Sequence, residues 1–286
     1  MTAVSYVPAA ALGIVLTAAI AAAQCRPPAN SHEARLLAFY EAPIAFTMAA
    51  APERLAPGAV RIGGEAIPVP SPSPTLQHPS YCYANTTNNT KLATIFGRPR
   101  VAIGLPAGFI VEASYLPNVT VAAAQANLVS FAVARTQGVP LGGKRLALTL
   151  RVDETAGEVR GAITCPRSSL QTADGNTPCY GSEPSRDTFH PNSYGLEGAL
   201  SARLGGDRIA AYAGGGMRSL RPRFRAGFTD GFGNVDHTTV DVDLVRGAAF
   251  AGATARIREE FAISAQLYAV PADVTTLRFG ALYALR

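Results

Sequence analysis

The stretch that decides the fold runs from residue 145 to residue 153 and reads RLALTLRVD. Its apolar residues are Leu146, Leu148, Leu150 and Val152, and its polar residues are Arg145, Thr149, Arg151 and Asp153. Successive side chains of a β-strand point to opposite faces. The stretch therefore predicts a strand with one apolar face and one polar, charged face.

The same alternation recurs along the rest of the chain, in residues 129–134, 194–204, 261–268 and 275–285. In the last of these, TTLRFGALYAL, the apolar positions from Leu277 to Leu285 oppose Thr276 and Arg278. A single two-faced strand is a weak signal, but a succession of them predicts a large antiparallel sheet.

The connections between these segments are asymmetric. One set is short, at residues 105–108, 139–143, 204–207 and 257–260, and the alternate set is longer and more polar, at 71–97, 117–125, 155–192 and 219–236. Short turns at one end and long loops at the other are typical of an all-β transmembrane barrel, an up-and-down antiparallel sheet closed on itself. Eight strands from residue 109 onward, with two more at 59–69 and 100–105, predict ten strands within a range of 8–12.

The composition agrees with such a barrel. Only 16% of the 286 residues are charged, and the mean hydropathy is +0.14, yet no internal run reaches the roughly 18 apolar residues of a spanning helix. The 27 glycines and 21 prolines suit many tight turns. The net charge of +5 comes from scattered arginines, which argues against a nucleic-acid partner and favours outer-membrane lipids and lipopolysaccharide, whose phosphates attract a cationic protein.

The first segment resembles an export signal. Residues 9–23 form a short apolar run, and Ala21 and Ala23 fit a cleavage site, so we expect a signal peptide over residues 1–23 and a mature chain beginning near Gln24. An uncleaved anchor and lipidation at Cys25 remain alternatives. We expect residues 24–58 to form a periplasmic or plug segment, in which 31–50 is a short helix or a further strand, and residues 59–286 to form the barrel.

Four cysteines fit an exported protein. Cys165 and Cys179 flank a polar, turn-rich stretch, which predicts a disulfide that closes this loop. Zinc binding is the alternative, but neither cysteine has a CxxC partner. The pattern does not show whether Cys25 and Cys82 pair.

Charges on the polar faces define the candidate site. In the predicted register the following side chains point into the lumen: Glu112, Arg145, Arg151, Asp153, Glu197, Arg203 and Arg278. Both signs are present in a narrow interior, so we expect ion pairs and a plugged barrel, with catalysis as the less favoured interpretation. Residues 240–254 conflict with this pattern, because lipid-facing Val240, Val242 and Leu244 would turn Arg246 outward. Either a β-bulge near residues 245–247 restores the order or Arg246 lies at the level of the lipid headgroups.

Two further clusters are candidates for chemistry in the loops. His190 and Ser193 could form a hydrolytic pair acting on lipids, although no acid partner is evident and a polar loop explains them as well. Four arginines, Arg218, Arg221, Arg223 and Arg225, fall in one predicted loop and are candidates for contacting lipopolysaccharide phosphates. We identify no metal site and expect no cofactor.

Residues 275–285 resemble the closing strand that the barrel-assembly machinery recognises in small bacterial outer-membrane β-barrel proteins. Residues 98–117 resemble the opening hairpins of uncharacterised barrels and, more distantly, of fatty-acid channel barrels. The resemblance covers residues 59–286 and implies a bacterial outer-membrane location. The expected function is structural or adhesive, or passive uptake of a small apolar solute, without enzymatic activity. The alternatives are a secreted soluble β-sandwich that binds a ligand, and an outer-membrane lipid hydrolase using His190 and Ser193.

Overall fold

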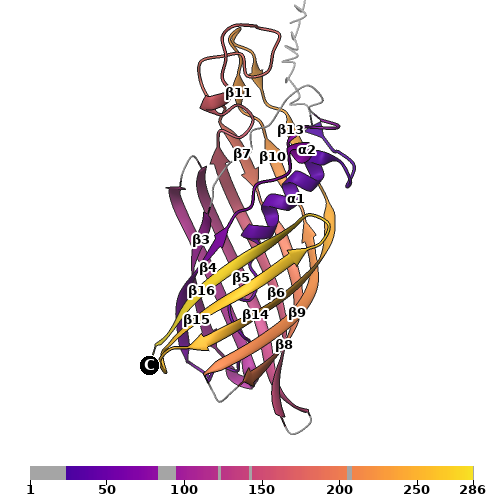
Figure 1. The fold of residues 1–286 in the computed structure, drawn as a ribbon. Coiled ribbons are helices and arrows are strands. Elements are labelled where there is room, and N and C mark those ends of the chain that lie inside the picture. Colours follow the sequence, from indigo (N-terminus) through magenta and orange to yellow (C-terminus); the bar gives the residue numbers. More distant parts are fainter. Residues whose placement is uncertain (1–23, 83–94, 122–123, 142–143, 205–207, 286) are drawn as a thin grey trace, which may run out of the picture.

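The computed structural model describes residues 24–82, 95–121, 124–141, 144–204 and 208–285, with the side chains of 119–121, 141, 144 and 145 left aside. Ten long strands form a closed antiparallel barrel, as predicted (Figure 1). Their bounds are β2 Val60–Pro68, β3 Ile95–Gly104, β4 Phe109–Val121, β5 Ala124–Leu141, β6 Lys144–Gly161, β8 Ser193–Leu204, β9 Ile209–Leu220, β14 Leu244–Arg256, β15 Phe261–Val270 and β16 Val274–Leu285.

Two strand pairs close the barrel. The last strand, β16, pairs with the first, β2, so that Leu285 lies opposite Val60. Strand β6 pairs with β5 along its whole length and with β8 along its lower part, where Arg151 lies opposite Glu197. Closure pairs the two end strands of the sheet, which a wall facing lipid requires, while β3 and β4 pair only from Val101 opposite Ala113 to Gly104 opposite Ile110. The closed sheet rules out the soluble β-sandwich, which needs two separate sheets.

The two faces of the wall differ as the alternation predicts. Large apolar side chains are solvent-accessible on the outside, including Phe131, Leu150, Leu196, Leu267 and Phe279. Polar and charged side chains alternate with them and are buried inside. An apolar outer band around a polar interior is the arrangement of a barrel surrounded by lipid. No helix in the described residues is long and apolar enough to cross a membrane.

The barrel has a short-turn end and a long-loop end. The C-terminal Leu285 lies at the short-turn end (Figure 1), which also carries the 3₁₀ turn η1 (Pro106–Gly108), where Ala107 and Gly108 have positive φ angles. By analogy with barrel topology in general, this end faces the periplasm. One predicted long connection is absent: β4 and β5 extend through most of residues 117–125, with a register shift between Leu116 and Val119.

An extension rises above the long-loop end (Figure 1). The upper end of β6 pairs with β7 (Asp187–His190), followed in order by β10 (Arg223–Arg225), β13 (Thr239–Asp241) and β1 (Gln24–Cys25). A small hairpin, β11 (Phe228–Thr229) and β12 (Val235–Asp236), and the turn η2 (Arg167–Ser169) complete it. We call this part of the molecule the extension.

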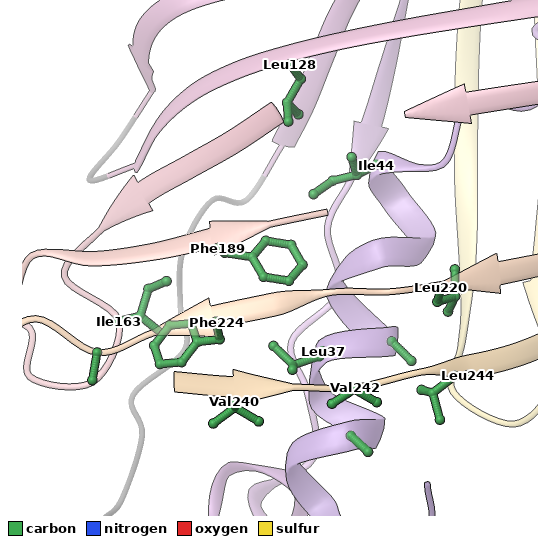
Figure 2. Close-up of a cluster of buried hydrophobic side chains, with 13 residues drawn as sticks. Leu37, Ile44, Leu128, Ile163, Phe189, Leu220, Phe224, Val240, Val242 and Leu244 are labelled. Carbon is green, nitrogen blue, oxygen red and sulfur yellow. The ribbon is translucent and has the colours of Figure 1, made fainter. Parts of the chain in front are cut away.

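The extension shares an apolar core with the N-terminal helix α1 (His32–Ile44). Figure 2 shows Phe189 and Phe224 of the extension strands beside Leu37 of the helix, in a cluster of buried apolar side chains. The disulfide Cys165–Cys179 lies in the extension, as predicted from its loop, and a second disulfide joins Cys25 to Cys82, beyond the short helix α2 (Pro74–Gln77).

The structure resolves the conflict around Arg246 without a bulge. Strand β14 begins at Leu244, so its even-numbered residues point inward, and Val240 belongs to the extension. Leu244 is buried, and the Arg246 Nε donates to Asp273 over 2.7 Å. The expectation that Leu244 faces lipid and Arg246 faces outward is therefore wrong.

Candidate functional site

The N-terminal segment passes through the lumen from end to end. Gln24 pairs with Thr239 in the extension at the long-loop end, whereas β2 begins at the opposite end. Between them, the last turns of α1 and residues 45–52 lie inside the wall, where Ala45, Phe46 and Thr47 are fully buried. We call residues 42–52 the plug segment. The chain therefore enters the barrel from the long-loop side, rather than starting at the periplasmic end.

Local sequence explains the helix that leads into the plug segment. Ser31 caps the first turn by accepting a hydrogen bond from the Ala34 NH. Pro43 occupies the last turn, and the helix ends one residue later. The last carbonyl groups of a helix have no partner within it and carry partial negative charge, so they favour nearby cations.

Arginines of the wall supply these cations. Arg98 on β3 donates to the Ile44 and Ala45 carbonyl groups over 2.8 and 2.7 Å. Arg278 on β16 donates to the Ala42 and Ala45 carbonyl groups over 2.5 and 2.9 Å. Arg151 on β6 donates to the Phe46 carbonyl over 2.5 Å. Three strands from different parts of the wall therefore hold one turn of the plug segment.

The ring of Phe46 lies among the same guanidinium groups. Arg100 is 4.1 Å from the ring centroid, and Arg98 and Arg151 are 4.8 and 4.9 Å away. Cation–π attraction of this kind is strongest when the cation is removed from water, and Phe46 is 0% exposed. Phe46 is thus the central anchor of the plug segment.

Further along, polar side chains of the wall satisfy the plug backbone. Gln266 donates to the Met48 carbonyl over 3.1 Å, and Ser264 donates to the Ala49 carbonyl. The Ala51 NH donates to Thr254 over 2.8 Å. Because buried backbone groups need partners, these contacts allow an irregular segment to lie inside the barrel.

The wall arginines are joined to carboxylates in a continuous chain of ion pairs. Glu65 contacts Arg98 and Arg100, and Arg100 also lies 2.6 Å from Glu112. The chain continues through Arg151, which is 3.5 Å from Glu112, 3.2 Å from Asp153 and 3.3 Å from Glu197. It ends at Arg218, 2.7 Å from Asp153 and 3.2 Å from Glu197. Each of these four carboxylates therefore lies within 3.5 Å of at least one guanidinium group.

Most of the predicted lumen charges belong to this chain or to the plug contacts. Glu112, Arg151, Asp153, Glu197 and Arg278 point inward, and all but Glu112 are less than 9% exposed. Arg203 lies at the short-turn end with its side chain 55% exposed. The side chain of Arg145 falls outside the described part of the structure.

Sequence reasoning missed Glu65, Arg98, Arg100 and Phe46. The three charged residues sit at alternate positions of β2 and β3, so the period-two pattern already contained them. Nothing in the pattern identifies Phe46, because its role depends on residues far away in the sequence.

The structure corrects the prediction that Arg218 contacts lipopolysaccharide. Arg218 is 4% exposed and points into the lumen from β9, so it cannot reach lipopolysaccharide. The strand continues to Leu220, two residues past Arg218, which removes that arginine from the loop. Arg221, Arg223 and Arg225 lie in the extension and are exposed, with Arg223 3.3 Å from Asp241 and Arg221 3.9 Å from Asp243.

The proposed hydrolytic pair is not assembled. The Ser193 hydroxyl is buried beside the Glu41 carboxyl group, and the described residues show no contact between it and His190. The His190 Nδ1 instead contacts the Gly157 carbonyl over 3.0 Å. A nucleophile must be within hydrogen-bond reach of its base and open to substrate, and Ser193 meets neither condition. In the described residues, no group of three or more His, Cys, Asp and Glu side chains could hold a metal ion.

The fold and the lumen together define the class of the protein: a closed, ten-stranded barrel of the outer-membrane type, with its own N-terminal segment in the lumen. A scan of protein-family models found no match, and neither did a search of curated proteins.

Three solved structures with a likeness to this chain are an attachment invasion locus protein, an outer membrane protein and a toluene transporter. Ail, the attachment invasion locus protein of Yersinia pestis, is 10% identical, with 80% of this chain and 100% of that chain covered, at a TM-score of 0.31. Omp33 of Acinetobacter baumannii is 9% identical, with 80% and 98% covered, at 0.27. The P. putida toluene transporter TodX is 12% identical, with 81% and 68% covered, at 0.26. Overlaps this low do not indicate a function, so the class rests on this chain's own strands and lumen.

Proposed function

We propose that this protein is an outer-membrane anchor that presents its extension at the cell surface while the plug segment keeps the lumen closed. The role is structural or adhesive, and it involves no enzymatic activity. The occupied lumen carries this proposal. Strands β2, β3, β4, β6, β8 and β9 contribute to the chain of paired charges around the plug segment, and such a chain favours a permanent seal over an open pore.

The extension has the features of a rigid surface module. Asp187 is fully buried and accepts hydrogen bonds from the NH groups of Ile163, Thr164 and Gly227. The Tyr180 and Phe232 rings pack at an angle of 40° with their centroids 5.1 Å apart, which joins the two long loops. Phe232 is still 69% exposed at the surface of the extension. A fixed, exposed aromatic side chain is suited to binding a partner surface.

Lipopolysaccharide is the proposed neighbour of the lower part of the extension. Arg221, Arg223 and Arg225 are exposed, and guanidinium groups pair well with phosphate. The proposal includes export through a signal peptide over residues 1–23 and insertion by the barrel-assembly machinery.

A second candidate is gated uptake of a small apolar solute. The apolar cluster (Figure 2) lies between α1 and the extension, which Figure 1 shows at the long-loop end of the barrel. A solute could pass only if the plug segment moved, because residues 42–52 occupy the path.

The two candidates differ in conductance and solute flux. The refolded protein is inserted into planar bilayers to measure conductance and into vesicles loaded with a non-electrolyte to measure solute flux. Protease digestion of intact cells reports whether the extension is exposed. The anchor predicts no conductance steps, no solute entry and cleavage within residues 162–192. Stable conductance or rapid swelling of the unaltered protein would replace the anchor with the uptake function.

A further inference from the structure

An arginine lies on the outer face of the barrel, where most side chains are apolar. Among the described side chains, the outward positions of the ten long strands carry four charged residues, which are Arg135, Glu154, Glu158 and Arg160. The last three lie on β6 toward the long-loop end, where β6 pairs with the first residues of β8 and with β7. Arg135 on β5 is therefore the one outward charge that the described strands carry toward the short-turn end.

Strand pairing fixes the level and the direction of the Arg135 side chain. Arg135 lies opposite Phe109, the first residue of β4, which directly follows the turn η1 at the short-turn end (Figure 1). Its chain neighbours Ala134 and Thr136 are buried inside the wall, whereas Arg135 is exposed. Because successive side chains of a strand point to opposite faces, the guanidinium group lies on the lipid side. At this level a barrel meets the periplasmic surface of the membrane.

Arg135 is held by an aromatic ring and not by a carboxylate. Its guanidinium carbon lies 5.3 Å from the centroid of the Phe109 ring, and it forms no ion pair with any carboxylate in the described part of the chain. A ring attracts a guanidinium group through its π electrons and leaves the positive charge in place. The lumen arginines share carboxylates with one another, whereas the charge of Arg135 remains available to a ligand.

The outward residues of β5 change in character along the strand. Phe131 and Val133 are apolar and exposed, Arg135 follows, and Gln137 is exposed nearer the short-turn end. Residues at alternate positions share a face and lie about 7 Å apart. An apolar surface, a cation and an amide therefore follow one another toward the periplasm. A phospholipid presents its acyl chain, its phosphate and its polar headgroup in the same order, so the two are complementary.

We propose that Arg135 binds the phosphate of an anionic phospholipid in the periplasmic leaflet, with Gln137 beside the headgroup and an acyl chain along Val133 and Leu150. Leu150 lies opposite Arg135 on β6 and is exposed on the same face. A guanidinium group pairs with phosphate through two parallel hydrogen bonds, and basic residues at a membrane surface attract anionic lipids. The proposal does not depend on the surface role of the extension, whose arginines lie at the opposite end of the barrel.

Native mass spectrometry tests this proposal. The refolded protein is released from detergent micelles that contain dioleoylphosphatidylglycerol, and the fraction of chains that retain one lipid is measured. Arg135→Gln should lower this fraction at least fivefold, and Arg135→Lys, which keeps the charge but loses the planar fork, should lower it less. Arg167→Gln is the matched control, because Arg167 is an exposed arginine in the turn η2 of the extension, and it should retain the lipid as the unaltered protein does.

Dioleoylglycerol, which has the same acyl chains and no phosphate, should be retained at least fivefold less than dioleoylphosphatidylglycerol. Migration in unboiled gels checks separately that each variant is folded. Equal retention by Arg135→Gln and Arg167→Gln would place the lipid on another surface and overturn the proposal. Equal retention of the two lipids would overturn it as well, because the acyl chains alone would then account for binding, and so would the absence of retained lipid on the unaltered protein.

Discussion

Replacing Phe46 with alanine should release the plug segment without unfolding the barrel. Phe46 is fully buried and is contacted by three guanidinium groups at 4.1–4.9 Å. Loss of a buried phenylalanine ring costs about 3–5 kcal/mol. The lost cation–π contacts add about 1–2 kcal/mol in total, a modest sum because the arginines keep their carboxylate partners.

A loss of about 5 kcal/mol corresponds to three to four powers of ten in the ratio of displaced to docked plug segment. The wall loses nothing directly, since no strand pairing involves Phe46. The loss should therefore appear as opening of the lumen and not as unfolding.

Single-channel recording in planar bilayers measures the opening. The Phe46→Ala variant should show frequent conductance steps, and a protease added from the long-loop side should cut within residues 45–58. Phe131→Ala is the matched control: it removes the same side chain from the outer wall, where Phe131 is 55% exposed, and it should leave the lumen closed. Identical conductance and proteolysis of Phe46→Ala and the unaltered protein would refute the role assigned to this residue.

Three further predictions concern other contacts. Burial alone would raise the pKa of Glu33, but hydrogen bonds from the NH groups of Tyr81 and Cys82 and from the Ser80 hydroxyl outweigh it and lower the pKa below 4.5. A carboxyl group with a lowered pKa stabilises the folded state at pH values above its ordinary pKa, and this stabilisation is lost as the pH falls through the lowered pKa. Amide exchange in residues 32–44 should therefore accelerate in acid, and Glu33→Gln should abolish this acceleration. The Cys25–Cys82 disulfide joins residues 57 apart in the sequence, compared with 14 for Cys165–Cys179. In the chain-entropy model, replacing each pair with serine should lower the free energy of unfolding by about 4 and about 3 kcal/mol, respectively. Only the loss of Cys25–Cys82 should accelerate amide exchange in α1. Leu150→Arg places a charge on the outer wall, where Leu150 is 61% exposed; it should lower the free energy of unfolding in vesicles by about 2–4 kcal/mol, whereas an unchanged denaturant midpoint would argue against lipid at that face.

The sequence predicted the wall better than the interior. Alternation over 145–153 and 275–285 places Arg151, Asp153 and Arg278 on the inner face, because a strand turns every second side chain the same way. The number of strands followed from the turns between such segments. Strand β3 begins at Ile95, ahead of the predicted start at residue 100, so Arg98 lay outside the predicted strand although it alternates with Arg100.

The plug contacts could not be predicted in this way. Arg98, Arg151 and Arg278 bind backbone carbonyl groups, which every residue has, so no side-chain pattern identifies the partners. The error at Arg218 has a related cause: a run of arginines suggested one loop, whereas β9 continues far enough to place the first of them in the lumen. The outer location of Arg221, Arg223 and Arg225 follows once that strand end is known.

The membrane barrel itself is tested most directly by heat-modifiability. The mature chain is refolded in detergent and run on a denaturing gel with and without boiling, and circular dichroism is recorded on the same sample. A closed ten-stranded barrel predicts a faster-migrating unboiled band, β-rich dichroism and a requirement for detergent. A chain that stays soluble without detergent and migrates identically in both lanes would contradict the account.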